Sequence, residues 1–279
     1  QALVGVHMSN VRIAIRDAIS RKIPYVYATQ YEGGEVAPGL FAIGETPVEQ
    51  YGNAVRWMIR EMGARRWYFV GNDYVWPRKT HDVVTRLVQE AGGEVVGVDY
   101  VPLGSTDHDP VLNNLRQSMP DIVFQSLVGT DCVTFNQEFG QRGLARHMMR
   151  LSGVIEENVL MGIGAENSEN LFAVAGYFSS LRTAENQAFL SEYASAFGTY
   201  APVQGGMSQA TYESIFFLAA LVGKSGSLDV ADMMSCADDF TYEGARGAVN
   251  VRRNGTSMQC HLMRASDLDY ELICSFPRV

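Results

Sequence analysis

Residues 2–28 read ALVGVHMSNVRIAIRDAISRKIPYVYA. Short apolar runs at 2–6 and 23–28 flank a segment at 11–21 whose apolar residues recur at the spacing of one helix face. The residues on this face are Val11, Ala14, Ile15, Ala18 and Ile19. The pattern predicts a strand–helix–strand unit. Because helices that cover a sheet usually accompany parallel strands, it also predicts a parallel sheet.

The same alternation resumes with the apolar run 67–70. A helix is predicted from Pro77 to Ala91, because proline suits a first helical turn and the glycines at 92 and 93 suit its end. Further predicted elements are a strand at 95–101, a helix at 110–118, a strand at 121–127 and a helix at 132–142. We therefore expect a second parallel sheet. No Pro/Gly/Ser-rich linker separates the two series, so the two lobes should join through direct chain crossings.

The last third of the chain changes character. The sequence predicts a strand at 173–178 and helices at 185–197 and 208–222. Two apolar runs, 248–252 and 258–263, then flank Asn254-Gly255. Both of these residues tolerate the positive φ of a type I′ turn. An antiparallel hairpin is therefore predicted near the C-terminal end.

Composition excludes several classes of partner. The 279 residues carry a formal net charge of -9, which opposes binding to nucleic acid or anionic lipid because both need an excess of Lys and Arg. The longest apolar run, Ile215–Val222, is much shorter than the roughly 20 residues of a membrane-spanning helix. The cysteines form no C-x-x-C pair and have no histidine at ligand spacing, so we expect free thiols and no metal site.

The sequence predicts no catalytic residues and no cofactor. It contains no His-Glu-x-x-His motif and no Walker loop, and Gly206-Met207-Ser208-Gln209 is followed by Ala210 where a nucleophile elbow needs glycine. Gly162-Ile163-Gly164 lacks the third glycine of a dinucleotide-binding loop. We therefore expect a binding protein rather than an enzyme, and an amide-hydrolysing enzyme is only a remote alternative.

Hydroxyl and aromatic side chains follow the predicted strands. These segments are His7-Met8-Ser9, Ala28-Thr29-Gln30-Tyr31 and Asn72-Asp73-Tyr74-Val75-Trp76. In open parallel sheets, ligands bind beyond the carboxyl ends of the strands. Aromatic rings supply flat apolar walls and hydroxyls fix hydrogen-bonding groups, so the set indicates a small neutral polar ligand. The alternative is local: Ser9 and Thr29 as helix caps or turn formers, and Tyr74 and Trp76 as surface packing.

These segments also resemble a known family. The resemblance rests on 7–9, 27–33 (Tyr-Ala-Thr-Gln-Tyr-Glu-Gly), 71–78 (Gly-Asn-Asp-Tyr-Val-Trp-Pro-Arg), 100–107 (Tyr-Val-Pro-Leu-Gly-Ser-Thr-Asp), 162–167 and 177–180. In this order and spacing they resemble the type I periplasmic-binding-protein-like receptors for urea and short-chain amides, which are related to branched-chain amino acid receptors and include the amide sensor of amidase operons.

The resemblance implies an α/β fold of two Rossmann-like lobes with parallel sheets, joined by a hinge of three chain crossings. We expect the first lobe at 1–63 and 181–225, the second at 64–177 and 226–279, and one hinge crossing at 178–180. Family members also carry further strand–helix units, on the order of 60 to 80 residues, before the strand that begins at Ala2. The resemblance thus implies an incomplete first lobe, and an unpaired strand edge there is expected to favour self-association.

The resemblance also implies the binding residues. Those expected to contact the ligand are Ser9, Tyr27, Thr29, Tyr74 and Trp76, with Tyr177 near the hinge and Met8, Gln30, Gly129, Thr130 and Val154 around them. Residues 128–131 and 154–156 would line the opposite wall. The chain departs from the family at Gly153-Val154-Ile155, where small hydroxyl residues are usual, and at Trp76, where tyrosine is usual. The first change implies a less polar pocket, and the second replaces a phenolic hydroxyl with an indole N–H donor.

The implied function is to bind urea or a short amide and present it to an ABC importer. The expected partner is then a transporter permease and the expected location is extracytoplasmic, either periplasmic or lipid-anchored. The alternative is a cytoplasmic amide sensor that controls an antiterminator-type regulator. A homodimer is compatible with either role.

Overall fold

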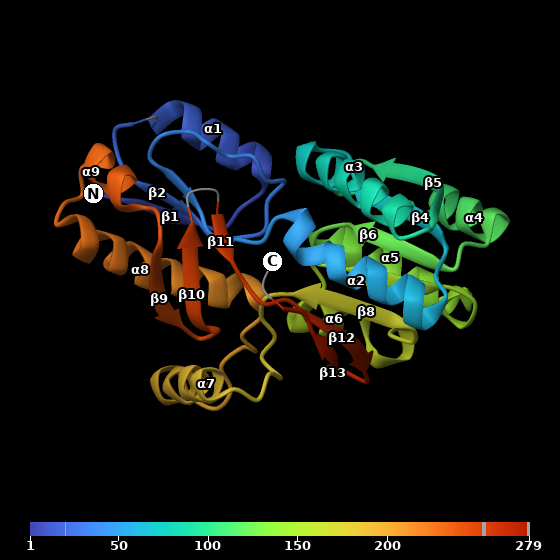
Figure 1. Cartoon of the computed structure of the whole chain (residues 1–279). Coiled ribbons are helices and arrows are strands. Elements are labelled where there is room, and N and C mark those ends of the chain that lie inside the picture. The colour runs from blue at the N-terminus through green and yellow to red at the C-terminus, as the bar shows by residue number, and fades with distance from the viewer. Residues whose placement is uncertain (20, 253–254, 278–279) are drawn as a thin grey trace.

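Figure 1 shows two α/β lobes side by side. The structure, a computed structural model, describes residues 1–19, 21–252 and 255–277, and the side chains of 252–257 are outside the description. Within these residues, no single helix has the length and hydropathy of a membrane span. The helices α8 (Gly206–Ser225) and α9 (Val230–Cys236), bent by 93°, together meet that test by length and composition alone.

The first lobe is built on a small parallel sheet. Its strands, in the order β1-β2-β3, are Leu3–Gly5, Tyr25–Tyr27 and Leu40–Ala42. Val4 aligns with Val26, and Val26 with Phe41. The remaining elements of this lobe are α1 (Ser9–Ile19), α7 (Ala184–Phe197), α8 (Gly206–Ser225), α9 (Val230–Cys236) and the antiparallel strands β9 (Phe240–Gly244), β10 (Gly247–Arg252) and β11 (Gly255–Ser257). The predicted strand–helix–strand unit at 2–28 is present.

The second lobe holds a seven-stranded sheet in the order β13-β12-β8-β7-β6-β4-β5. Its strands are β4 (Arg66–Asn72), β5 (Glu94–Val101), β6 (Ile122–Ser126), β7 (Met149–Ser152), β8 (Leu171–Ala175), β12 (His261–Ser266) and β13 (Asp269–Ser275). Strands β4 to β8 are parallel, whereas β12 runs antiparallel to β8 and β13 antiparallel to β12. The antiparallel edge closes the sheet with the last strands of the chain.

Alternate residues of these strands enter two different cores. Phe69 and Phe124 pack with α2 (Pro47–Met62) and α3 (Val75–Glu90) on one face. Val70 and Val123 pack on the other face with α4 (Asp109–Ser118), α5 (Gly129–Gln141) and α6 (Glu157–Ile163). This period-2 division is what a strand buried on both faces requires, and it explains why the strands read as nearly continuous apolar runs.

The core packing corrects the expected lobe boundaries at two places. The first lobe was expected to extend to residue 63, but Tyr51, Val55 and Met58 of α2 are buried in the core of the seven-stranded sheet. Residues 226–257 were expected in the second lobe, but Met233 and the β9–β10 pair share a core with β2, β3 and α8. An amphipathic helix or hairpin shows in sequence which face it buries, but not against which sheet.

Three segments connect the lobes, at 43–46, 176–183 and 258–260. The crossing expected at 178–180 lies within the second of them. The hairpin prediction was partly wrong: β10 pairs with Gly255–Ser257, whereas the predicted second strand forms β12, which pairs with β8 and β13. Asn254, on which the turn prediction rested, lies outside the described residues.

Candidate functional site

A cavity of about 320 Å³ lies between the lobes, beyond the carboxyl ends of β1, β2, β4, β6 and β7. This is the place that parallel α/β sheets provide for ligands. It is lined by Val6, His7, Met8, Ser9, Tyr27, Thr29, Gln30, Tyr74, Trp76, Val128, Gly129, Val154, Glu156, Val159 and Met207. We refer to it as the outer cavity.

The structure brings together most of the residues expected from the sequence. Met8, Ser9, Tyr27, Thr29, Gln30, Tyr74, Trp76, Gly129 and Val154 all line the outer cavity. Tyr177 instead lines a smaller cavity that adjoins it, and Thr130 lines neither. Thr130 lies in the first turn of α5, where its backbone carbonyl accepts a hydrogen bond from Thr134, 3.0 Å away.

Met207 and Val159 also line the outer cavity and were not expected. Met207 belongs to the Gly-Met-Ser-Gln segment that the sequence offered only as an incomplete nucleophile elbow. It reaches the cavity because α8 begins there and its first turn faces the end of β2, where the Met207 sulfur lies 2.9 Å from Thr29 Oγ1. The only local signal was a single large apolar residue, Met207, in a first helical turn that otherwise holds glycine, serine and glutamine.

Ser9 is held by a buried ion pair rather than being free to face the cavity. Its hydroxyl donates to Glu32 Oε2 at 2.7 Å, and Arg12 Nη2 lies 2.6 Å from Glu32 Oε1. Burial alone would raise the pKa of Glu32, but the hydrogen bonds from Arg12 and Ser9 hold the pKa below its usual value. The Arg12 guanidinium is neutralised by Glu32 and by Glu35, whose Oε2 lies 3.4 Å from Arg12 Nε.

The aromatic side chains that line the outer cavity are held by contacts with residues of their own lobe. The Tyr27 hydroxyl donates to the His7 carbonyl at 2.6 Å, and burial raises the pKa of Tyr27 to about 12, so the phenol stays neutral. Tyr74 stands at the N-cap of α3, and its ring centroid lies 6.3 Å from that of Trp76. Trp76 is 4% exposed, so this wall of the outer cavity is rigid and apolar.

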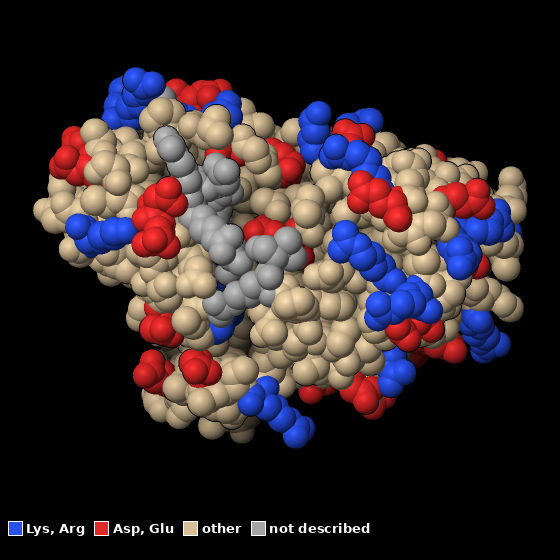
Figure 2. Space-filling view, in the orientation of Figure 1, with Lys and Arg blue, Asp and Glu red and all other residues tan. Residues whose placement is uncertain are grey.

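Among the described residues that line it, the outer cavity has one acidic side chain and no Lys or Arg. Burial raises the pKa of that residue, Glu156, although a hydrogen bond from the Met207 N–H to its Oε2 opposes the shift. On the outside of the molecule, basic and acidic side chains alternate over the face that Figure 2 shows. Among the described residues, no group of His, Cys, Asp and Glu side chains could hold a metal ion.

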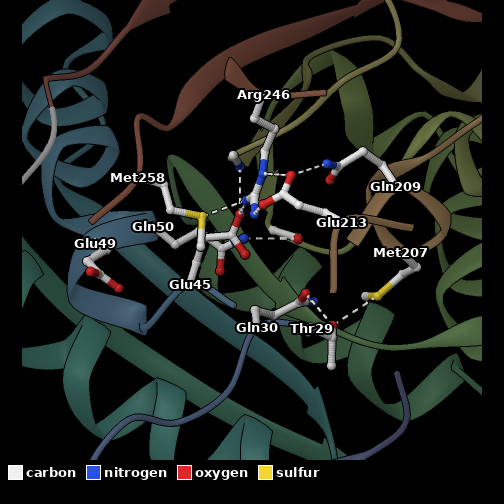
Figure 3. A network of polar contacts seen from close by, with 12 residues as sticks. Thr29, Gln30, Glu45, Glu49, Gln50, Met207, Gln209, Glu213, Arg246 and Met258 are labelled. Carbon is white, nitrogen blue, oxygen red and sulfur yellow. Dashed lines mark hydrogen bonds and ion pairs between the residues drawn. The ribbon is translucent and has the colours of Figure 1, made fainter. Parts of the chain in front are cut away.

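A charged network lies where the lobes meet (Figure 3). Arg246, from the β9–β10 turn, pairs with the fully buried Glu213 of α8 and lies 3.4 Å from Glu45. Glu45 Oε1 also accepts the Gly176 N–H at 2.9 Å, which joins the first crossing to the second. Gln50 Nε2 donates to the carbonyls of Gly153 and Val174, at 3.0 and 2.9 Å.

Comparison with known proteins identifies the family and the fold. A family model described as periplasmic binding protein matches residues 1–267. A Leu/Ile/Val-binding protein homolog 6 from Brucella melitensis biotype 1 is 22% identical over 243 residues, which cover 85% of this chain and 58% of that protein. The Brucella abortus protein of the same name shows the same identity and the same coverage. The chain thus spans less than two thirds of the length of these curated relatives.

Solved structures match nearly the whole chain. A solute-binding protein of an ABC transporter from Rhodopseudomonas palustris HaA2, in complex with p-hydroxybenzoic acid, superimposes with a TM-score of 0.89 at 20% identity, over 99% of this chain and 78% of that one. A leucine-binding protein from Thermotoga maritima MSB8 gives a TM-score of 0.84 at 16% identity, over 99% and 79%. With the family model spanning residues 1–267, the chain belongs to the periplasmic binding protein family and has its type I fold.

Proposed function

We propose that this chain is the ligand-binding part of a solute-binding protein that closes on a small neutral molecule of the urea and carboxamide class and presents it to an ABC importer. The observation that carries the proposal is the outer cavity itself. It is enclosed by aromatic and aliphatic side chains and has Glu156 but no Lys or Arg in its wall.

The absence of a cation in this wall argues against an anionic ligand. Burying a carboxylate without a partner costs several kcal/mol. Two buried arginines lie near the cavities, and both are already paired with carboxylates. Arg12 pairs with Glu32 and Glu35, and Arg246 pairs with Glu213 and Glu45. A carboxamide has the shape of the corresponding carboxylate without its charge, and its N–H groups suit the acceptor oxygens of Glu156.

The size of the outer cavity favours the larger members of the class. Pockets of roughly 300 Å³ and more accommodate drug-sized ligands, and urea alone would leave most of the 320 Å³ to water. The family's structural neighbours include proteins in complex with benzoate and 4-hydroxybenzoate. An amide with an apolar or aromatic body therefore fits Tyr27, Tyr74 and Trp76 better than urea does.

The importer role is favoured over the cytoplasmic amide sensor because the similar structures include solute-binding proteins of ABC transporters. The permease of such a transporter is the proposed partner, and an extracytoplasmic location of the whole protein is part of the same proposal. The cavity hydroxyls are not bonded to a histidine, because Ser9 donates to Glu32, Thr29 contacts Gln30 and Met207, and His7 Nε2 pairs with Tyr25. The described cavity residues therefore do not form the hydroxyl–histidine pair of a serine hydrolase.

Calorimetric titration of the purified chain tests this proposal. The ligands are urea, acetamide, propionamide, benzamide, benzoate, 4-hydroxybenzoate and leucine. We expect benzamide to bind at least about tenfold more tightly than benzoate, since the pair differs chiefly in charge. Tight binding of benzoate or leucine together with no response to any amide would overturn the proposal.

A further inference from the structure

A second, smaller cavity of about 40 Å³ lies behind the outer cavity, against the hinge. The two share Thr29, Gln30, Val154, Glu156 and Met207 as lining residues, so they adjoin. We call the smaller one the inner cavity. Its remaining wall includes Gln209 and Arg246, which Figure 3 shows on either side of Glu213.

Gln209 presents an acceptor that nothing in the described protein satisfies. The residue is 1% exposed, and its Nε2 donates to Glu213 Oε2. Because an ionised Glu213 can only accept, this bond fixes the orientation of the amide and turns Oε1 away from Glu213. Oε1 is buried and has no hydrogen-bond partner among the described residues. Buried polar groups are rarely left unpaired, so we expect a hydrogen-bond donor to bind this oxygen atom.

Neighbouring protein groups do not supply that donor, because they are engaged elsewhere. Arg246 is bonded to Glu213 and approaches Glu45 and Met258. Gln50 donates to two backbone carbonyls. Glu156 and Glu45 add further acceptor oxygens to the inner cavity, so a second acceptor such as a carboxylate would meet oxygen atoms on several sides.

We infer that the inner cavity is a subsite for a small hydrogen-bond donor: a water molecule in the unliganded protein, and the NH₂ group of a primary carboxamide in the complex. A cavity of 40 Å³ exceeds the roughly 10 to 15 Å³ that one water needs. The body of the ligand would remain in the outer cavity between Tyr27 and Trp76. The second half of this inference rests on the proposed function.

The test compares amides that differ only at nitrogen. Propionamide, N,N-dimethylpropionamide and, as a larger pair, benzamide and N,N-dimethylbenzamide are titrated into the wild type and into Gln209→Met. The substitution removes the acceptor at similar size and leaves Glu213 bonded to Arg246 and Tyr242. We expect it to weaken binding of the primary amides roughly five- to a hundredfold and to leave the dimethyl amides unchanged.

Gln187→Met, at an exposed position in α7, is the matched control. It should change the affinity for neither the primary nor the dimethyl amides. An equal loss for primary and dimethyl amides, or no loss for either, would overturn the subsite. A crystal structure of the unliganded protein provides a readout that does not depend on amide binding. If no amide binds, the proposed function fails, while a water bonded to Gln209 Oε1 still supports the subsite and a dry or closed inner cavity refutes it.

Discussion

At the scale of single residues, the sequence located the walls of the site better than its polar groups. Tyr74 and Trp76 could be expected because they follow an apolar strand, and Tyr27 was expected from the family resemblance; the structure places all three at one cavity. Gln209 could not be expected, since its role depends on Glu213 holding its amide and on α8 beginning close to the end of β2. Hydrogen-bond partners that are distant in sequence leave no local pattern.

Trp76 provides a test of the apolar wall. Trp76→Ala should weaken binding of benzamide by at least about tenfold, because the indole forms a buried wall of the cavity and its removal leaves a void beside the ligand. Trp76→Phe keeps a ring and loses only the N–H donor, so it should cost less than about threefold. Titration calorimetry on both variants gives the comparison; an equal loss would mean that the N–H group, not the wall, matters.

His81 is a buried neutral histidine that should make stability pH-dependent. Its Nδ1 lies 3.0 Å from the Tyr100 hydroxyl and its Nε2 lies 2.5 Å from Ser126 Oγ. Burial, with a contribution from Arg78, lowers the pKa of His81 to about 3. The unfolded chain therefore takes up this proton near pH 6.5 and the folded chain only near pH 3, so stability is lost as the pH falls through that window.

For this one group, the free energy of unfolding should fall by about 1.4 kcal/mol per pH unit, or about 2 kcal/mol between pH 6.5 and pH 5. Urea unfolding at pH 7 and pH 5 measures it. The pH difference should shrink by about that amount in His81→Gln, which can keep both hydrogen bonds. His147→Gln, at an exposed histidine, is the control; if both variants retain the wild-type pH difference, His81 is not the cause.

At the scale of elements, most of the longer helices were predicted, whereas the short helices α6 and α9 were not. The predicted Pro77–Ala91 helix corresponds to α3 at Val75–Glu90, and the predicted 185–197 helix to α7. The short strands β3 and β7, of 3 and 4 residues, were not predicted. The equally short β1 and β2 were predicted because the apolar stripe of the helix between them identified the unit. The sheet against which α2 packs was also not predicted, because Tyr51, Val55 and Met58 could pack against either sheet.

The contact between α2 and the end of β7 gives an element-scale prediction. A Cβ added at Gly153 would clash with the Tyr51 hydroxyl and the Gln50 amide, because it would lie well inside their van der Waals contact distance. Gly153→Ala should therefore push α2 away, weaken the Gln50 bond to the Gly153 carbonyl and destabilise the fold by about 1 to 3 kcal/mol. Chemical unfolding measures the change.

The same substitution at Gly223 is the matched control. Gly223 lies on α8 with nothing within 4 Å of an added Cβ. Alanine there should stabilise the protein by about 0.5 to 1 kcal/mol, because glycine weakens a helix interior. If Gly153→Ala were as stabilising as Gly223→Ala, the close packing of α2 on the end of β7 would be disproved.

At the scale of the whole molecule, the alternation of strands and helices was enough to predict two α/β lobes with a site between them. The chain nevertheless exchanges elements between lobes in a way that periodicity does not reveal. Residues 258–260 carry it from the β9–β11 sheet to β12, which completes the seven-stranded sheet beside β8. The hairpin signal at Asn254-Gly255 indicated a turn but not the change of sheet that follows it.

The edge of the first sheet gives a prediction for the whole molecule. Among the described residues, β1 pairs only with β2. Leu3 N donates to the Pro24 carbonyl and Gly5 O accepts from Ala28, so in a parallel ladder the N–H and C=O of Val4 point away from β2. An unpaired edge of this kind can add a strand from another molecule. We expect the 279-residue chain to self-associate reversibly through β1 as its concentration rises.

Val4→Pro tests this edge selectively, because proline removes the outward N–H and leaves the bonds of Leu3 and Gly5 to β2. It should weaken self-association by at least about tenfold, since it blocks edge pairing in both molecules. Val4→Ala loses similar apolar contact with the core but keeps the N–H, so it should associate like the wild type. Sedimentation velocity over a broad concentration range measures all three proteins. A wild type that stays monomeric throughout, or equal effects of proline and alanine, would show that β1 is not the contact.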